Sequence, residues 1–377
     1  MSISMSMSMS MNPNSVRILD GGLGTSLEDR YGAVFDDSTP LWSSHLIVSD
    51  PDTLLACQRD FVQAGADVLL TATYQISIEG FARTKVPQYP DGIPRFVIER
   101  YLANAVKIAE KAAATKTKNG GAQSSSSAAT PASLALSLGP YGACMIPGQE
   151  YSGRYDDEHN TEEALYRWHL ERLRLFTNVQ GLMDRITYVA FETLPRLDEI
   201  RAVRRAFHDA HLGSKKFWIS CVFPGEANLL PDGTAIDRAV KGMLEPLSGG
   251  GGCAQPWGIG INCTKMNKLP SLIRSYAQSV RNLTASLSGL GTAPCLLLYP
   301  DGTKGEVYNT TTKKWEKQAD TREAGHQPWA KDLASIVRTT QDQGVFSSFV
   351  VGGCCKASAV DISELCREFP GPSSSCT

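Results

Sequence analysis

The amino-acid sequence predicts a single (β/α)8 TIM barrel, and three observations support that fold. Short apolar runs alternate with longer segments of helical periodicity along most of the chain, as expected for parallel strands joined by helices. Eight such strand-plus-helix units fit within the 377 residues, which suits a (β/α)8 barrel. Polar and thiol-bearing residues follow most of the apolar runs, and the active sites of such barrels lie at the carboxyl ends of their strands.

The expected elements are taken in chain order. The strands are the short apolar runs, at residues 17–19, 67–73, 133–138, 187–191, 217–222, 258–262, 294–299 and 346–351. The helices lie between these runs, where apolar residues recur with the period of a helix. They include residues 53–64, 94–113, 161–183, 197–208, 234–247, 268–287, 329–343 and 359–368.

Three segments depart from this alternation. Residues 116–130 are rich in Ser, Ala and Gly and hold few large apolar side chains, so we expect a flexible low-complexity insert there. Residues 248–252 read SGGGG and are a second loose connection. Residues 301–327 are expected to form a long loop after the seventh strand that helps to cover the site. None of these segments marks a domain boundary.

Composition excludes several functional classes. The chain is 42% apolar and 20% charged with a net charge of −2, which offers no electrostatic footprint for nucleic acid or an anionic membrane surface. No stretch approaches the roughly 20 apolar residues of a membrane span, and the first eleven residues lack the pattern of a secretory signal. We therefore expect a cytoplasmic protein with no nucleic-acid or membrane partner. It is expected to be a monomer, because no long amphipathic dimerisation arm is evident.

The expected organisation is one barrel domain at residues 15–369, flanked by disordered tails at 1–14 and 370–377. The ten cysteines are scattered through a large chain, so they indicate a reducing compartment rather than a disulfide framework. Seven of them are expected to be ordinary packing residues: Cys57, Cys144, Cys221, Cys253, Cys295, Cys366 and Cys376.

The remaining three cysteines form the most informative pattern in the chain. Cys354 and Cys355 follow an apolar run and a Gly-Gly turn, and Cys263 ends another expected strand. Adjacent cysteines are poor disulfide partners for each other, because the resulting ring is strained, but together they can bind one soft cation. Three thiolates leave the fourth tetrahedral position open, as in a working zinc site. A substrate thiol held there would be a thiolate at neutral pH.

Other interpretations of these cysteines remain open. Free cysteines often pack as small apolar residues, and a closed structural zinc would make the protein a binding or regulatory barrel. No fourth ligand stands out for a closed site, and the six histidines show no ligand spacing to the cysteines. A thiol–disulfide oxidoreductase is weaker, because the usual two-residue spacing between its cysteines is missing. His169, His208 and His211 are expected on solvated helix faces.

Two carboxylates lie at expected strand ends. Glu192 leaves an apolar strand, and a buried unpaired charge is costly, so it should meet a cation such as a substrate ammonium. The alternative is an ion pair with a nearby arginine. Asp20 begins a glycine-rich segment in which Gly21 and Gly22 allow close approach of the backbone to a small ligand, although Asp20 also suits a simple turn. Gln75 and Asn262 offer further polar groups at strand ends.

Taken together, the strand ends resemble the homocysteine S-methyltransferase family. The matching motifs run from residue 15 to 369 in the family's order: LDGGLGT at 19–25, PLWS at 40–43, TATYQ at 71–75, GPYG at 139–142, FETLP at 191–195, GINC at 260–263, YP at 299–300 and GGCC at 352–355. Jointly these motifs are highly specific. The PLWS, GPYG and FETLP segments resemble the branch that uses S-methylmethionine or S-adenosylmethionine more than the betaine-using or cobalamin-dependent branches.

The resemblance implies one zinc ion held by Cys263, Cys354 and Cys355, with the sulfur of homocysteine as the fourth ligand. It implies that Glu192 receives the homocysteine amino group and that Asp20 lies close to the substrates. Backbone amides around Gly21, Gly22 and Leu23 would hold the carboxylate. The zinc-bound homocysteine thiolate would then attack the methyl group of a sulfonium donor to give methionine, without a protein nucleophile.

The donor site is less well defined by the sequence. Trp42, Tyr74 and Tyr141 are candidates, because aromatic rings attract cations, and each is also compatible with simple packing. S-methylmethionine and S-adenosylmethionine share the sulfonium amino-acid end, so the residues do not choose between them. Loops at 35–40 and 301–327 would set such a preference. A second thiol or selenol acceptor, such as selenocysteine, is an alternative to homocysteine.

Overall fold

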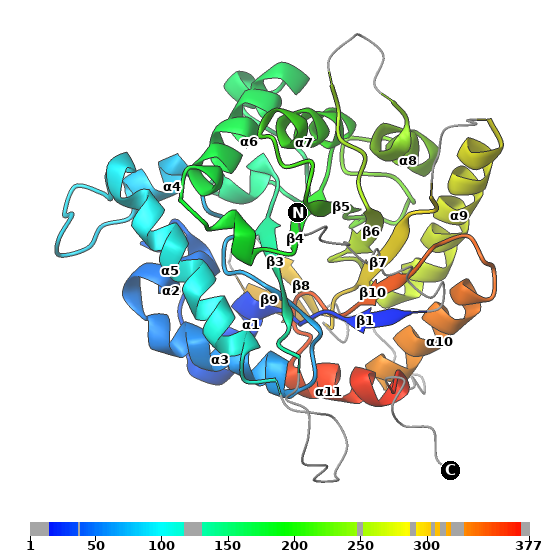
Figure 1. The fold of residues 1–377 in the computed structure, drawn as a ribbon, viewed down its shortest axis with the longest axis horizontal. Coiled ribbons are helices and arrows are strands. Elements are labelled where there is room, and N and C mark those ends of the chain that lie inside the picture. Colours follow the sequence, from blue (N-terminus) through cyan, green and yellow to red (C-terminus); the bar gives the residue numbers. More distant parts are fainter. Residues whose placement is uncertain are drawn as a thin grey trace, which may run out of the picture.

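The computed structural model describes residues 15–36, 38–116, 130–246, 252–286, 292–302, 306–309, 314–317 and 328–370. Eight parallel strands surround a common axis and helices form an outer ring around them (Figure 1). The predicted (β/α)8 barrel is therefore confirmed. The expected insert, apart from its ends, the amino-terminal tail and almost all of the carboxyl-terminal tail lie outside the described residues.

The barrel strands form one sheet in the order β1-β10-β7-β6-β5-β4-β3-β2. Their bounds are β1 Val16–Ile18, β2 Val68–Leu70, β3 Ser133–Leu138, β4 Tyr188–Leu194, β5 Lys216–Cys221, β6 Gly258–Asn262, β7 Cys295–Tyr299 and β10 Phe349–Val351. All eight coincide with expected strands. Buried parallel strands are covered on both faces and consist of nearly continuous apolar residues, which explains why the sequence identified them.

Backbone hydrogen bonds close the barrel between its first two strands. Leu19 forms an isolated parallel bridge with Val68. Asp67 N donates to Ile18 O at 2.7 Å, and Asp20 N donates to Val68 O at 3.2 Å. Because Asp20 takes part in this closure through its main chain, its side chain is fixed at the carboxyl end of the barrel.

The outer ring contains the expected helices. They are α3 Pro51–Gln63, α5 Arg95–Ala113, α6 Glu162–Thr177, α7 Leu197–Asp209, α8 Ile236–Leu244, α9 Leu269–Ser286, α10 Trp329–Gln341 and α11 Ala359–Glu368. Three short helices were not expected: α1 Leu23–Tyr31, α2 Leu46–Ser49 and α4 Ile78–Arg83. Each lies in a connection that begins at a strand end, and none is long enough for a helical period to stand out in the sequence.

Two hydrophobic clusters stabilise the barrel. The larger one packs the strands against the helices, and the smaller one fills the barrel interior. Trp218 and Tyr299 are buried members of the inner cluster, and Trp218 Nε1 donates to Tyr299 Oη at 3.2 Å. Their polar atoms are thereby paired, as buried aromatic polar groups require.

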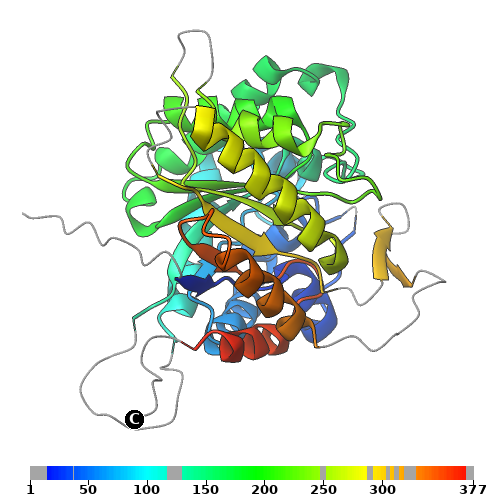
Figure 2. The ribbon, with the colours of Figure 1, turned by 90° about the vertical axis from the view of Figure 1, so that its right-hand side faces the viewer.

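The segment after β7 differs from the expected loop. Within residues 301–327 an antiparallel pair is formed by β8 Glu306–Asn309 and β9 Lys314–Lys317. Figure 2 shows this ribbon standing out beside the barrel. The expected long connection after β7 thus contains a short antiparallel hairpin that the sequence analysis did not anticipate.

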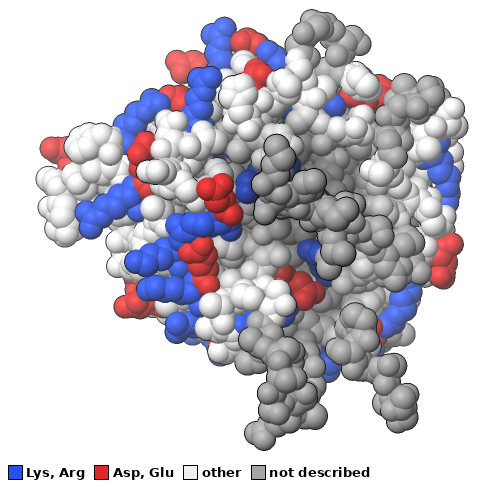
Figure 3. All heavy atoms as spheres, viewed as in Figure 1, with Lys and Arg blue, Asp and Glu red and all other residues white. Residues whose placement is uncertain are grey.

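The surface agrees with the balanced composition. On the face drawn in Figure 3, lysines and arginines lie among aspartates and glutamates. None of the helices in the described part of the chain combines the length and apolar character needed to cross a membrane.

The close approach of β6 and β7 requires a glycine. A Cβ atom at Gly260 would lie 2.5 Å from the carbonyl oxygen of Leu297 and 2.6 Å from its Cβ. We predict that Gly260→Ala destabilises the fold by about 1–3 kcal/mol, the usual range for an overpacked core. Thermal unfolding measures this as a lowered Tm. Gly213→Ala is the matched control, because a Cβ there meets nothing within 4 Å; equal Tm values for the two variants would contradict the prediction.

Candidate metal centre and substrate pocket

One pocket lies at the carboxyl ends of the barrel strands. It is lined by residues that end or follow β1, β2, β3, β4, β6, β7 and β10, and by parts of the connections at 35–43 and 143–151. The residues singled out in the sequence all line this pocket except Asn262 and Tyr141. The carboxyl ends of the strands thus gather the predicted groups, as in other barrels of this kind.

The three thiols converge at one side of the pocket. The sulfur atoms of Cys263, Cys354 and Cys355 all lie within 4.8 Å of one another. A disulfide bond joins Cys263 to Cys354, whose Cα atoms are 5.4 Å apart, and the Cys355 thiol is free. Only the reduced form offers three thiolates, so disulfide formation and binding of a cation by the whole trio exclude each other.

The surroundings of the trio suit a soft metal ion. Asn262 Nδ2 donates to Cys263 Sγ at 3.3 Å and to Thr193 Oγ1 at 2.7 Å. The hydroxyl of Tyr151 lies 4.0 Å from Cys355 Sγ. Among the described residues, no histidine or carboxylate joins the three cysteines in the cluster. Three sulfur donors with hydrogen bonds from neighbouring groups match an open thiolate site rather than a closed one.

Asn262 therefore acts on a cysteine rather than on the pocket. It is fully buried, and its Oδ1 accepts the backbone N–H of Thr193 at 2.9 Å. Its side chain holds the ends of β4 and β6 together beside Cys263. The sequence proposed it as a substrate-binding residue, but its amide is occupied by these contacts.

Burial makes the free thiol hard to ionise by itself. Desolvation, with a smaller contribution from the negative charge of Asp301, raises the pKa of Cys355 to about 12. At neutral pH this thiol is protonated unless a cation lies close to it. A bound metal ion is the kind of neighbour that reverses this preference.

Asp20 combines a structural contact with an open one. Its Oδ2 accepts the backbone N–H of Leu70 at 2.9 Å, which ties the end of β1 to β2. Its Oδ1 is buried without a hydrogen-bond partner, and burial raises the pKa of the carboxyl well above its usual range. The simple-turn interpretation does not account for this unpartnered oxygen in a ligand pocket.

Glu192 lies in the last part of β4 and is 5% exposed. Its Oε1 accepts the hydroxyl of Ser137, and burial raises the pKa of its carboxyl to about 7. No salt bridge to Glu192 is present within the described part of the chain; the nearby Arg172 instead donates to the carbonyl of Gly139 at 2.7 Å. The alternative of an arginine ion pair was therefore wrong, and the carboxylate is left to face the pocket.

The amino-terminal end of α1 also opens on the pocket through Leu23, Gly24 and Thr25. No side chain caps this end, so its first amides are available to an anion. The N–H of Gly22 is not, because it donates to the carbonyl of Ala357 at 2.9 Å. Of the amides that the sequence suggested for a carboxylate, that of Gly22 is therefore occupied, while those of Leu23, Gly24 and Thr25 lie at the uncapped start of α1.

Aromatic rings form part of the pocket lining. Trp42 and Tyr74 both line the pocket. Tyr141 does not: its ring stacks on His159 with centroids 4.1 Å apart, and its hydroxyl donates to Asp156. Tyr141 is therefore a packing residue of its own connection, and its nomination for the donor site is not supported by its position.

Sequence reasoning missed two pocket residues and misplaced a histidine. Glu150 and Tyr151 line the pocket from the connection after β3; the only signal for them was a carboxylate next to an aromatic residue in an irregular segment.

His169, expected on a solvated face, is 1% exposed, and its Nε2 lies 2.9 Å from Glu199 Oε1. The cysteines expected to be ordinary are free where they are described, and Cys376 lies outside the described residues.

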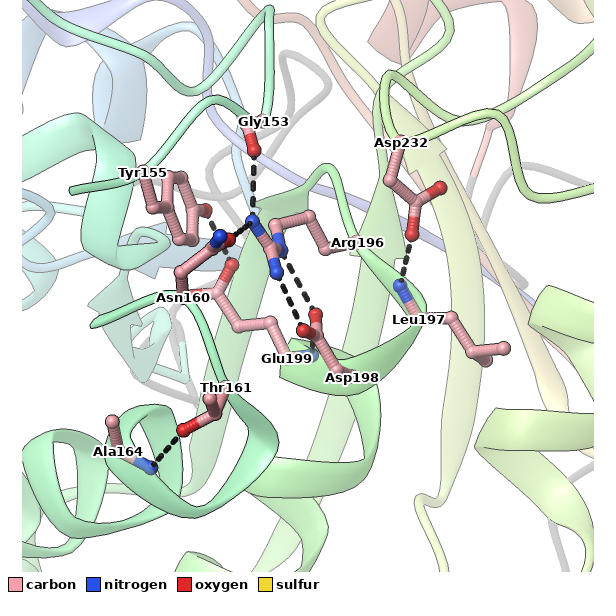
Figure 4. Close-up of polar contacts among 10 residues, drawn as sticks. All are labelled: Gly153, Tyr155, Asn160, Thr161, Ala164, Arg196, Leu197, Asp198, Glu199 and Asp232. Carbon is pink, nitrogen blue, oxygen red and sulfur yellow. Dashed lines mark hydrogen bonds and ion pairs between the residues drawn. The ribbon is translucent and has the colours of Figure 1, made fainter. Parts of the chain in front are cut away.

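The connection that carries Glu150 is fixed by the start of α7. Arg196 donates to the carbonyl of Gly153 at 3.0 Å and to Asn160 Oδ1 at 2.7 Å, and it forms a two-point ion pair with Asp198 (Figure 4). Tyr155 donates its hydroxyl to Glu199 at 2.5 Å. The connection after β3 thereby acquires a defined position beside the pocket that it lines.

Curated proteins resemble this chain over most of its length. Homocysteine S-methyltransferase 2 of Zea mays is 30% identical over 350 residues, covering 93% of this chain and 88% of that protein. Betaine-homocysteine S-methyltransferase of Drosophila melanogaster is 28% identical over 337 residues, covering 89% of this chain and 88% of that protein.

The barrel also resembles solved structures of the homocysteine methyltransferase MmuM from Escherichia coli. The oxidized form has a TM-score of 0.63 at 25% identity and covers 93% of this chain and 94% of that one. The metallated form has a TM-score of 0.62 at 24% identity, with coverages of 93% and 96%. The family model described as homocysteine S-methyltransferase matches residues 17–369, and the chain therefore belongs to the homocysteine S-methyltransferase family.

Proposed function

We propose that this protein is a zinc-dependent methyltransferase that transfers a methyl group from a sulfonium donor to homocysteine and forms methionine. One observation carries the proposal: three convergent thiols border a pocket whose charged lining residues are all acidic within the described part of the chain, namely Asp20, Asp36, Glu150 and Glu192. Family membership supports the acceptor, and the metal, the donor and the role of each residue are our proposals.

Cys263, Cys354 and Cys355 would hold the metal in their reduced state. Soft thiolate ligands favour zinc, and the absence of a fourth protein ligand among the described residues leaves room for the substrate's sulfur. When bound, zinc supplies a positive charge that keeps a thiol ionised at neutral pH. Asn262 and Thr193 hold Cys263 in place through the contacts described above.

The amino-acid part of homocysteine has a matching set of groups. Glu192 and Asp20 would receive its ammonium, since both carboxyls are buried and neither has an ion-pair partner among the described residues. The amides at the start of α1 would hold its carboxylate. Each charge of the zwitterion would thereby meet protein groups of the opposite sign.

The donor is proposed to be a sulfonium amino acid, either S-methylmethionine or S-adenosylmethionine. Trp42 and Tyr74 offer ring faces to a cation, and the acidic lining attracts positive charge. Betaine carries its positive charge on nitrogen and leaves an uncharged amine after transfer. A sulfonium amino acid carries an ammonium group in addition to its sulfonium. The acidic side chains of the pocket can bind that ammonium.

The chemistry requires no protein nucleophile. The homocysteine thiolate attacks the methyl carbon, a new sulfur–carbon bond forms, and the electron pair of the broken bond returns to the donor sulfur as a neutral thioether. The pocket's contribution is to hold the two sulfur-containing molecules in line at an approach of roughly 3–3.5 Å.

Methionine formation from homocysteine, followed with S-methylmethionine, S-adenosylmethionine and betaine in turn, tests the proposal. Turnover with betaine alone, or with none of the three, would refute it.

Removing the free thiol tests the metal ligands. We predict that Cys355→Ser, purified under reducing conditions, loses its stoichiometric zinc and at least about 100-fold of its turnover, because a serine hydroxyl is a poor ligand for a soft cation. Metal analysis and methionine assays measure the two effects. Cys366→Ser is the matched control, since Cys366 is a half-buried cysteine of α11 outside the pocket. Full zinc content in Cys355→Ser would exclude this residue as a ligand.

Neutralising Glu192 should separate binding from stability. We predict that Glu192→Gln raises the KM for homocysteine about 10- to 100-fold, the range for a lost charged hydrogen bond. The carboxyl has a pKa raised to about 7, so its protonated form stabilises the fold and that stability is lost as the pH rises through 7. The ligand-free variant should therefore have a higher Tm than the wild type at pH 8, with the difference shrinking at pH 5. A lower Tm at pH 8 would argue against an unpaired carboxylate.

A further inference from the structure

Glu150 is a pocket carboxylate without a counter-charge. It lines the pocket beside the thiols, and its Oε2 is shielded from solvent and has no hydrogen-bond partner. Burial raises the pKa of this carboxyl to about 7. The described residues that line the pocket include no lysine, arginine or histidine. A carboxylate in this environment is stabilised when a cation enters.

The position of Glu150 is near the reacting end of the pocket. Its negative charge contributes to the raised pKa of Tyr74 and Tyr151, and the Tyr151 hydroxyl lies 4.0 Å from Cys355 Sγ. Gly148 leaves room for the carboxylate, because a Cβ at that residue would lie 2.6 Å from Glu150 Oε2. The absence of a side chain at Gly148 therefore gives the Glu150 carboxylate its space close to Cys355.

Glu150 is distinct from the two carboxylates proposed for the homocysteine ammonium. Asp20 follows the end of β1, Glu192 lies in β4, and the two carboxyls interact with each other electrostatically. Glu150 instead belongs to the connection after β3, which Arg196 and Glu199 attach to the start of α7 (Figure 4). The attachment fixes the loop before any ligand binds, so the charge is held in place rather than brought in by closure.

We propose that Glu150 is the counter-ion of the sulfonium group of the methyl donor. This inference rests on the proposed function and names a specificity residue for the donor half of the site. Trp42 and Tyr74 then contact the methyl and methylene groups of the sulfonium, while Glu150 faces its positive charge. A neutral thioether lacks that charge, so Glu150 distinguishes donor from product.

The charge balance of the reaction predicts how the residue acts. The sulfonium charge disappears as the methyl group leaves, so a carboxylate beside it stabilises the bound donor more than the transition state. Glu150 should therefore lower the KM for the donor without raising kcat. An ammonium keeps its charge throughout, and a carboxylate paired with it would strengthen binding of donor and methionine equally.

Kinetics of Glu150→Gln with S-methylmethionine test the inference on the zinc-loaded enzyme. We expect the donor KM to rise about 10- to 100-fold, with kcat undiminished. The KM for homocysteine and the inhibition constant of methionine should change less than twofold. Glu150→Asp, which keeps the charge, should recover part of the loss. Glu158→Gln is the matched control, because Glu158 is an exposed carboxylate of the same connection that does not line the pocket.

The outcomes separate this inference from the proposed function. No wild-type turnover with a sulfonium donor would refute the proposed function. If the wild type turns over but the donor KM is unchanged in Glu150→Gln, only the role of Glu150 is overturned. The same holds if the inhibition constant of methionine rises as much as the donor KM. If Glu150→Gln does not fold, Gly148→Ala decides, since its methyl group displaces the carboxylate: a raised donor KM supports the inference and an unchanged one overturns it.

Discussion

The convergence of three thiols from two strands that are not neighbours is the constraint on which the site depends. β7 separates β6 from β10, and one row of the sheet aligns Ile261, Leu298 and Val351. Each thiol-bearing segment begins within three residues of that row, so barrel curvature brings the sulfurs together. Backbone bonds extend the alignment past the strands: Cys263 N donates to the carbonyl of Tyr299 at 3.2 Å, and Cys354 N donates to that of Pro300 at 2.8 Å. The register of β6, β7 and β10 thus determines that the three cysteines meet.

The second organising feature is uncompensated negative charge. Asp20, Glu150 and Glu192 lie in a pocket whose described lining contains no basic side chain, and burial raises the pKa of each carboxyl. Such groups oppose folding and are retained where a ligand supplies the missing charge. Homocysteine and the proposed sulfonium donor would together bring two ammonium groups and one sulfonium, which are the positive charges that this lining lacks.

Much of the fold and part of the site were accessible from the sequence. Buried parallel strands and the Gly-Gly-Cys-Cys turn carry strong local signals, and the strand-end rule then places Glu192 and Cys263 at one face. Side chains in irregular connections carry no such signal. Tyr141 was expected in the pocket but packs on His159, and Glu150 was missed, because both depend on how Arg196 and Glu199 fix the connection after β3. His169 was misplaced for the same reason: its buried partner, Glu199, is 30 residues away.

The most direct test of the central claim is the coordination of zinc in the reduced protein, measured by X-ray absorption with and without homocysteine. We expect three sulfur ligands in the protein alone and four after homocysteine is added, because the trio leaves one tetrahedral position to the substrate. Four sulfur or nitrogen ligands from the protein itself, unchanged by homocysteine, would contradict a thiol-activating site and indicate a structural metal.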